Sequence, residues 1–113
     1  MKEYDFVVGV PCSGIKDKIG KIKKYIPCTR EDEALSMATG AFLAGKKPLV
    51  FLQNSGLGNT VDAITSLLKP YGIEIDLLIS LRRKPEHHAF MGKITIGLLK
   101  LLEYKNYKVV DEC

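Results

Sequence analysis

Three groups of polar residues in this chain have the side chains and the spacing to form a ligand-binding or catalytic site. The first is the stretch QNSGLGN, residues 53–59, which offers neutral hydrogen-bond donors and acceptors. Its glycines, Gly56 and Gly58, allow a tight turn and a close approach of the backbone to a ligand. No Lys-Ser/Thr pair follows the glycines, so the stretch is not a P-loop and suits a polar, uncharged ring better than a phosphate. An ordinary turn between a strand and a helix is the alternative interpretation.

The second group is the acidic run at residues 31–33, at the predicted start of a helix. Acidic residues in a first turn interact favourably with the helix macrodipole, and this is our interpretation for Asp32 and Glu33. Glu31 has a further possible role, as a buried acid that hydrogen-bonds a ligand nitrogen where water is excluded. Both roles fit the sequence around Glu31.

The third group consists of His87 and His88, next to Glu86. Two adjacent histidines cannot easily chelate one metal, and no third ligand follows at a suitable spacing, so we predict no metal site. One histidine could act as an acid or a hydrogen-bond donor, because the pKa of a histidine lies near neutrality. A solvent-exposed histidine in a loop is the alternative.

The cysteines, Cys12, Cys28 and Cys113, form no CxxC pair and are odd in number. This argues against a disulfide scaffold or a zinc site and favours a reducing compartment. Cys12 and Cys28 each follow a predicted strand and could form a redox pair. We prefer the interpretation that they are small buried hydrophobic residues.

Strands and helices alternate along the chain. We expect strands at residues 5–10, 25–28, 48–53, 73–81 and 107–110, and helices after Ser13, from Thr29 to Gly45, at 60–69 and at 95–102, with a polar loop at 82–89. Thr29 with Asp32 resembles a capping box, and one apolar stripe of that helix contains Ala34, Met37, Ala38, Ala41 and Phe42. This order predicts an α/β fold with a doubly wound, mostly parallel, flavodoxin-like sheet and helices on both faces.

The predicted topology brings the polar groups together. The clusters at residues 12–14, 29–33, 53–59 and 82–88 all follow the carboxyl ends of predicted strands. Ligands bind at that edge of an open parallel sheet, so we expect one site there.

Size and composition exclude several classes of protein. A chain of 113 residues with 46% hydrophobic and 27% charged residues is expected to form one globular domain. The net charge of +4 comes mainly from lysines, without stacking aromatics between them, so nucleic-acid binding is not expected. No apolar run approaches the ~20 residues of a membrane span, and the start has no signal-peptide pattern. We therefore expect a cytoplasmic protein without membrane contact.

Three segments carry a likeness to a known family, in unbroken order between residues 6 and 103: VVGVPCSGIKD, CTREDEALSMATGAFLAGKKPLVFLQNSGLGN and LLISLRRKPEHHAFMGKIT. The chain resembles the pyrimidine-binding domain of thiamine-diphosphate-dependent 2-oxoacid decarboxylases, in particular the sulfopyruvate decarboxylase alpha subunit and phosphonopyruvate decarboxylase. The resemblance implies a thiamine-diphosphate-binding fold, with residues 1–113 as a single pyrimidine-binding domain that is shortened at both ends.

The resemblance also implies roles for particular residues. Glu31, nine residues before Gly40, matches the glutamate that bonds the aminopyrimidine ring and promotes loss of the thiazolium proton. His88, three residues before Met91, matches a histidine near the substrate, with a role in substrate binding or in protonation. The cofactor-binding loop corresponds to Gln53, Asn54, Ser55, Gly56, Leu57, Gly58 and Asn59. Candidates to pair with a sulfonate or phosphonate are Arg82, Arg83 and Lys93.

A partner chain is implied as well. The family holds the diphosphate through Mg²⁺ on a GDG-plus-Asn motif, and this sequence has no Asp-Gly pair. The resemblance therefore implies a carboxy-lyase that is active only in an oligomer with a beta subunit, which binds Mg²⁺ and shares thiamine diphosphate. The substrate would be a small anionic 2-oxoacid, and for sulfopyruvate the pathway would be coenzyme M biosynthesis. The alternatives are a catalytically silent binding or assembly module with the same fold and, less favoured, a nucleotide-binding domain.

Overall fold

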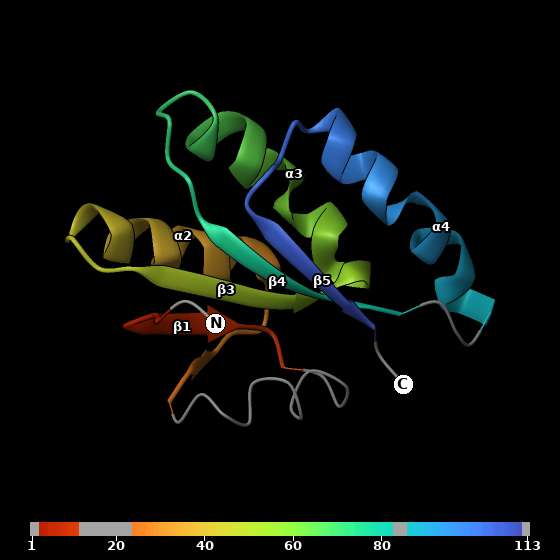
Figure 1. Cartoon of the computed structure of the whole chain (residues 1–113), viewed down its shortest axis with the longest axis horizontal. Helices are drawn as coiled ribbons and strands as arrows, with labels where there is room; N and C mark the ends of the chain where they lie inside the picture. Colours follow the sequence, from red (N-terminus) through yellow and green to blue (C-terminus); the bar gives the residue numbers. More distant parts are fainter. Residues whose placement is uncertain (1–2, 12–23, 83–85, 112–113) are drawn as a thin grey trace.

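The computed structural model describes residues 3–11, 24–82 and 86–111, and in them five strands form one parallel sheet (Figure 1). The strands are β1 (Phe6–Gly9), β2 (Ile26–Pro27), β3 (Pro48–Gln53), β4 (Asp76–Leu81) and β5 (Tyr107–Asp111). Their order in the sheet is β2-β1-β3-β4-β5. This is the flavodoxin-like order, so the predicted α/β fold with a parallel sheet is confirmed.

The helical segments described by the structure cover one face of the sheet, as Figure 1 shows. They are α2 (Glu31–Leu43), the 3₁₀ helix η1 (Asn54–Thr60), α3 (Val61–Ala63), the π-helical segment η2 (Ile64–Leu68) and α4 (Glu86–Leu101). The helix that we expect after Ser13 lies outside the described residues.

The alternation of side chains along each strand separates two hydrophobic clusters. Val50 and Leu52 of β3 pack on the helical face together with Leu35 of α2. Leu49 and Phe51 point to the other face, where Tyr25 packs edge-on against Phe51 at 5.3 Å between ring centroids. β3 is the middle strand of the five and contributes to both clusters, so it is the centre of the fold.

Two segments that we expect to be loops are helical. Residues 54–59 lie in η1, with Gln53 as the last residue of β3, and α4 begins at Glu86, well before the predicted start at residue 95. The predicted loop at 82–89 is therefore wrong over its second half. Polar residues in the first turns of a helix produce no hydrophobic stripe, which explains why the pattern of apolar residues shows only the second half of α4.

The predicted start of α2 needs a correction. The helix begins at Glu31 after Arg30, and no side chain caps it. Instead of a capping hydroxyl from Thr29, the backbone N–H of Thr29 donates to Glu33 Oε1 at 3.4 Å. Two members of the predicted apolar stripe, Met37 and Phe42, are 37% and 39% exposed, so the buried stripe is narrower than expected.

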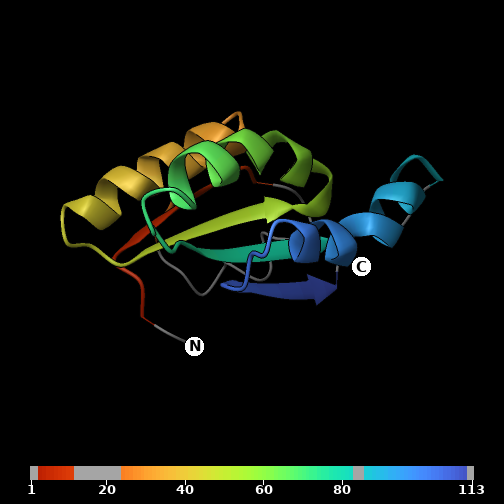
Figure 2. The same ribbon diagram turned by 90° about the horizontal axis from the view of Figure 1, so that it is seen from above.

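The carboxyl ends of the strands meet at one edge, which we call the carboxyl edge. Since β1 lies between β2 and β3, the chain crosses over between sequential strands, and such a switch point is where doubly wound sheets bind ligands. In Figure 2 the strand arrows point toward this edge, and the first turns of α4 extend beyond it. Glu31, η1 and Arg82 each follow a strand at this edge.

Candidate functional site

Glu31 points into the protein from the first turn of α2 and is only 9% exposed. It lies three, four and seven residues before three buried residues, Ala34, Leu35 and Ala38. Residues with this spacing share one face of a helix, so the packing of α2 against β1 and β3 carries Glu31 inward. Ala34 and Ala38 belong to the apolar stripe predicted from the sequence, and their spacing from Glu31 favours its buried role over the macrodipole role.

The carboxylate of Glu31 lies between two residues of η1. Asn59 donates a hydrogen bond from Nδ2 to Glu31 Oε1 at 2.9 Å. A Cβ at Gly56 would stand 2.1 Å from Glu31 Oε2, so position 56 must be glycine for the carboxylate to lie where it does. The absent side chain of Gly56 thus makes room for Glu31, whereas the sequence suggests only a tight turn or an approach to a ligand.

The two acidic neighbours of Glu31 lie on the outside of the helix. Asp32 Oδ1 accepts hydrogen bonds from Arg30 Nε and from the backbone N–H of Glu33, each at 3.0 Å. The hydrogen bond from Arg30 is the main reason why the pKa of Asp32 lies below its usual range. Glu33 is exposed. Both residues occupy the first turn, as expected for carboxylates that interact with the macrodipole.

The residues of the predicted cofactor loop divide into a buried and an exposed set. Asn54, Gly56 and Leu57 are buried, and Leu57 belongs to the core on the helical face. Ser55, Gly58 and Asn59 are exposed, and Gln53 at the end of β3 is half-buried. Within residues 53–59, the atoms that can reach the surface of the carboxyl edge therefore belong to Gln53, Ser55, Gly58 and Asn59.

Asn54 is fully buried, and its side chain bonds to two other elements. Its Nδ2 donates to the backbone carbonyl of Arg82 at 3.1 Å and to Thr95 Oγ1 at 3.0 Å. Its Oδ1 accepts from the backbone N–H of Arg82 at 2.8 Å. Both N–H groups of the amide are therefore used within the chain, and Asn54 joins η1 to the end of β4 and to α4. The one sequence signal for this contact is Thr95, a polar residue in an otherwise apolar helix segment.

We expect Asn54→Ala to lower the free energy of unfolding by about 3 kcal/mol, because it removes three buried hydrogen bonds that join η1 to Arg82 and Thr95. Urea denaturation followed by circular dichroism measures this loss. Ser55→Ala is the matched control, since it removes one exposed hydroxyl of the same helix and should cost less than about 0.5 kcal/mol. Equal losses in the two variants would contradict the bridging role of Asn54.

His88 lies in the first turns of α4 and is half-buried, so it is not the loop residue that the sequence suggests. It precedes Thr95 by seven residues, or about 10 Å along the helix axis. His88 is the third residue of α4, so it belongs to the first turns of this helix, which extend past the carboxyl edge in Figure 2. The side chain of His87 lies outside the described residues. The structure therefore groups Glu31, Gly56 and Asn59 closely and places His88 on a separate element.

Two of the candidate cations have described positions. Arg82 follows β4 directly and is half-buried, with its backbone held by Asn54. Lys93 is exposed on α4. Arg83 lies outside the described residues. Arg82 is thus the candidate cation that the fold holds at the carboxyl edge.

Cys28 is a buried core residue. Its Sγ donates to Met37 Sδ at 3.6 Å, and burial, with a further contribution from Glu33, raises the pKa of the thiol. This confirms the interpretation of Cys28 as a small hydrophobic residue, because a raised pKa disfavours the reactive thiolate. Cys12, the other half of the suggested pair, lies outside the described residues.

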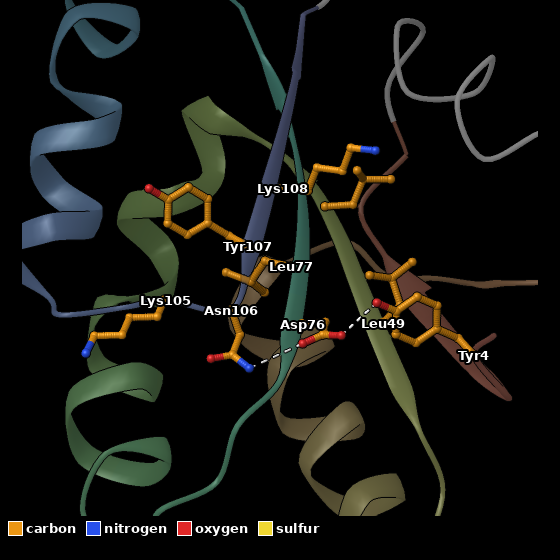
Figure 3. Close-up of a pocket in the computed structure, with 9 residues that line it drawn as sticks. Tyr4, Leu49, Asp76, Leu77, Lys105, Asn106, Tyr107 and Lys108 are labelled. Carbon is orange, nitrogen blue, oxygen red and sulfur yellow. Dashed lines mark hydrogen bonds between the residues drawn. The ribbon is translucent and has the colours of Figure 1, made fainter. Parts of the chain in front are cut away.

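A cavity of about 410 Å³ lies at the opposite, amino-terminal edge of the sheet (Figure 3). Tyr4 donates its hydroxyl hydrogen to Asp76 Oδ2 at 2.7 Å in its wall, and Asn106 Nδ2 lies 3.4 Å from Asp76 Oδ1. Burial and the hydrogen bond to Asp76 raise the pKa of Tyr4. Since Asp76 begins β4 and Arg82 follows its other end, this cavity is not part of the candidate site.

The described residues contain neither a candidate metal-binding cluster nor a candidate membrane span. No group of three or more His, Cys, Asp or Glu residues in residues 3–11, 24–82 and 86–111 could hold a metal ion. Within the same ranges no helix has the length and apolar character needed to cross a membrane.

In a comparison with known proteins, the chain is similar to several decarboxylases. No family model matches the chain. The sulfopyruvate decarboxylase alpha subunit of Methanococcus maripaludis is 40% identical over 96% of this chain and 71% of that subunit. The same subunit of Methanocaldococcus jannaschii is 39% identical, over 92% of this chain and 67% of that subunit. The phosphonopyruvate decarboxylase of Streptomyces viridochromogenes is 38% identical over 86% of this chain, which corresponds to 27% of that enzyme.

Proposed function

Since the chain belongs to the family of the sulfopyruvate decarboxylase alpha subunits, we propose that it is the alpha subunit of a thiamine-diphosphate-dependent decarboxylase. Its substrate would be sulfopyruvate or a similar small anionic 2-oxoacid, and for sulfopyruvate the pathway would be coenzyme M biosynthesis. The observation that carries the proposal is the buried carboxylate of Glu31 at the carboxyl edge, for which Gly56 leaves room.

The described residues fit the aminopyrimidine part of thiamine diphosphate. A ring nitrogen that carries a proton, as in the imino tautomer of that ring, needs an acceptor with negative charge, and Glu31 is a carboxylate with little exposure to water. Asn59 bonds only one of its two oxygens. Gln53, Ser55 and Gly58 of the same segment add neutral polar or backbone groups, which suit a ring without charge.

The chemistry divides between the cofactor and the chain. When bound, thiamine diphosphate supplies the nucleophilic carbon and the electron sink that a 2-oxoacid needs to lose carbon dioxide. Glu31 would hold the ring and keep a negative charge next to its nitrogen, where low exposure to water strengthens the interaction. His88 would bind the substrate or donate a proton, and Arg82 would pair with the anionic tail.

A second chain would complete the site. Three of the relatives are named as alpha subunits of sulfopyruvate decarboxylase, which implies a partner subunit. We propose that a beta subunit binds the diphosphate through Mg²⁺ and that the active complex is an oligomer of both chains. A silent binding module with the same fold is not favoured, because such a module has no need for a buried Glu31 opposite a glycine.

Purification of the tagged chain from its own cells, followed by a sulfopyruvate decarboxylation assay, tests the proposal. We expect a second subunit to co-purify and carbon dioxide to be released only when both thiamine diphosphate and Mg²⁺ are present. Assays with phosphonopyruvate and with pyruvate then show whether the substrate must carry a sulfonate, a phosphonate or no second anionic group. A chain that is recovered alone and is inactive with all three acids would favour the silent module.

A further inference from the structure

Asn59 contacts Glu31 and does so from the solvent side. The carboxylate is buried, whereas Asn59 is exposed, and their hydrogen bond of 2.9 Å joins residues that are 28 positions apart. The amide therefore lies over the carboxylate at the surface of the carboxyl edge. This position differs from that of Asn54, whose amide is used inside the fold.

The 3₁₀ geometry of η1 explains why Asn59 reaches Glu31. A 3₁₀ helix has three residues per turn, so residues three apart lie above one another on the same side. Gly56 and Asn59 have this spacing within Asn54–Thr60, and both face Glu31. The first leaves room for one carboxylate oxygen, and the second bonds the other.

The contact restricts the orientation of the carboxylate. The last torsion of a glutamate side chain is broad and roughly two-fold, so packing of the aliphatic part does not fix how the two oxygens are turned. The hydrogen bond from Asn59 holds Oε1 of Glu31, and Oε2 lies on the side of Gly56. A carboxylate held in this way presents one defined acceptor to a ligand.

We propose that Asn59 is a positioning residue that orients Glu31, so that Oε2 receives an N–H of the bound ring. The inference rests on the proposed function, because the ring is that of thiamine diphosphate. It reassigns Asn59 from a contact with the cofactor to a contact with the acid. Mutation of a group that orients a binding side chain in this way typically lowers affinity or activity by about 10- to 100-fold.

A double-mutant cycle tests the proposal in the complex with the partner subunit. Asn59→Ala, Glu31→Gln and the double variant are compared with the unmutated complex, by calorimetric titration with thiamine diphosphate and by turnover. We expect Asn59→Ala to weaken cofactor binding and to lower turnover by about 10-fold or more in the unmutated background. In the Glu31→Gln background the same change should alter both quantities by less than about 2-fold, since no charged oxygen remains to be presented to the ring.

Each outcome decides between the roles. If Asn59→Ala has equal effects in both backgrounds, Asn59 acts independently of Glu31 and the positioning role is wrong, while the proposed function stands. If Asn59→Ala has no effect in either background, the positioning role is also wrong. If the unmutated complex does not bind thiamine diphosphate, the proposed function fails, and the inference fails with it.

Discussion

Glu31→Gln is expected to lower turnover by about 100- to 1000-fold while the chain still folds and still binds its partner. The amide has nearly the shape of the carboxylate, and its oxygen can still accept the hydrogen bond from Asn59. It carries no negative charge, however, and it presents N–H groups where the ring needs an acceptor. Loss of a well-placed electrostatic contact at a reacting group typically costs this much.

Steady-state decarboxylation by the assembled complex measures the effect, and thermal denaturation checks the fold. Glu33→Gln is the matched control, because Glu33 is an exposed carboxylate in the same turn of α2. We expect its turnover to remain within about 2-fold of that of the unmutated complex, since exposed charges contribute little. Near-normal turnover in Glu31→Gln would refute the role of Glu31.

Gly56→Ala is expected to displace Glu31 and to impair both stability and turnover. The new Cβ would lie 2.1 Å from Glu31 Oε2 and 2.3 Å from its carboxyl carbon, so the side chain must move. We expect a loss of about 1–3 kcal/mol in the free energy of unfolding, as in other overpacked sites. Turnover should fall by about 100-fold, the usual effect of a displacement of about 1 Å in a catalytic group.

Gly97→Ala provides the control for Gly56→Ala. Gly97 is exposed in α4, and a Cβ there would meet no atom within 4 Å. Alanine favours a helix over glycine, so this variant should gain up to about 1 kcal/mol and keep its turnover. Denaturation and turnover of both variants are measured together. If Gly56→Ala behaves like Gly97→Ala, Gly56 does not make room for the carboxylate.

The sheet could be predicted from the sequence because its strands are short apolar runs between polar turns. β3 begins and ends at the predicted residues, and the other strands lie within the predicted ranges except for the last residue of β5, Asp111. The helical segments were harder to place. Nothing in QNSGLGN shows the apolar spacing of a helix, since its only apolar side chain is Leu57, and α4 starts with polar residues.

The site could be predicted only in part, for a reason that lies in side-chain contacts between distant segments. The sequence indicates that Glu31 and residues 53–59 follow strands at the same edge. It does not show that Gly56 faces Glu31 or that Asn54 bonds the backbone of Arg82, because both contacts depend on how η1 packs. The spacing of Glu31 from Ala34 and Ala38 was the signal that favours its inward position.

The hydrogen bonds of Asn54 to the backbone of Arg82 continue the pairing of β3 and β4 past its last backbone pair, Gln53 with Ser80. The side chain of Asn54 thus takes the place of one further backbone pair between β3 and β4. Its hydrogen bond to Thr95 joins the same point to α4. The ends of the two strands and this helix therefore cannot fray separately and should open as one cooperative unit. A change at position 54 therefore has to be matched by changes in the segments that it joins.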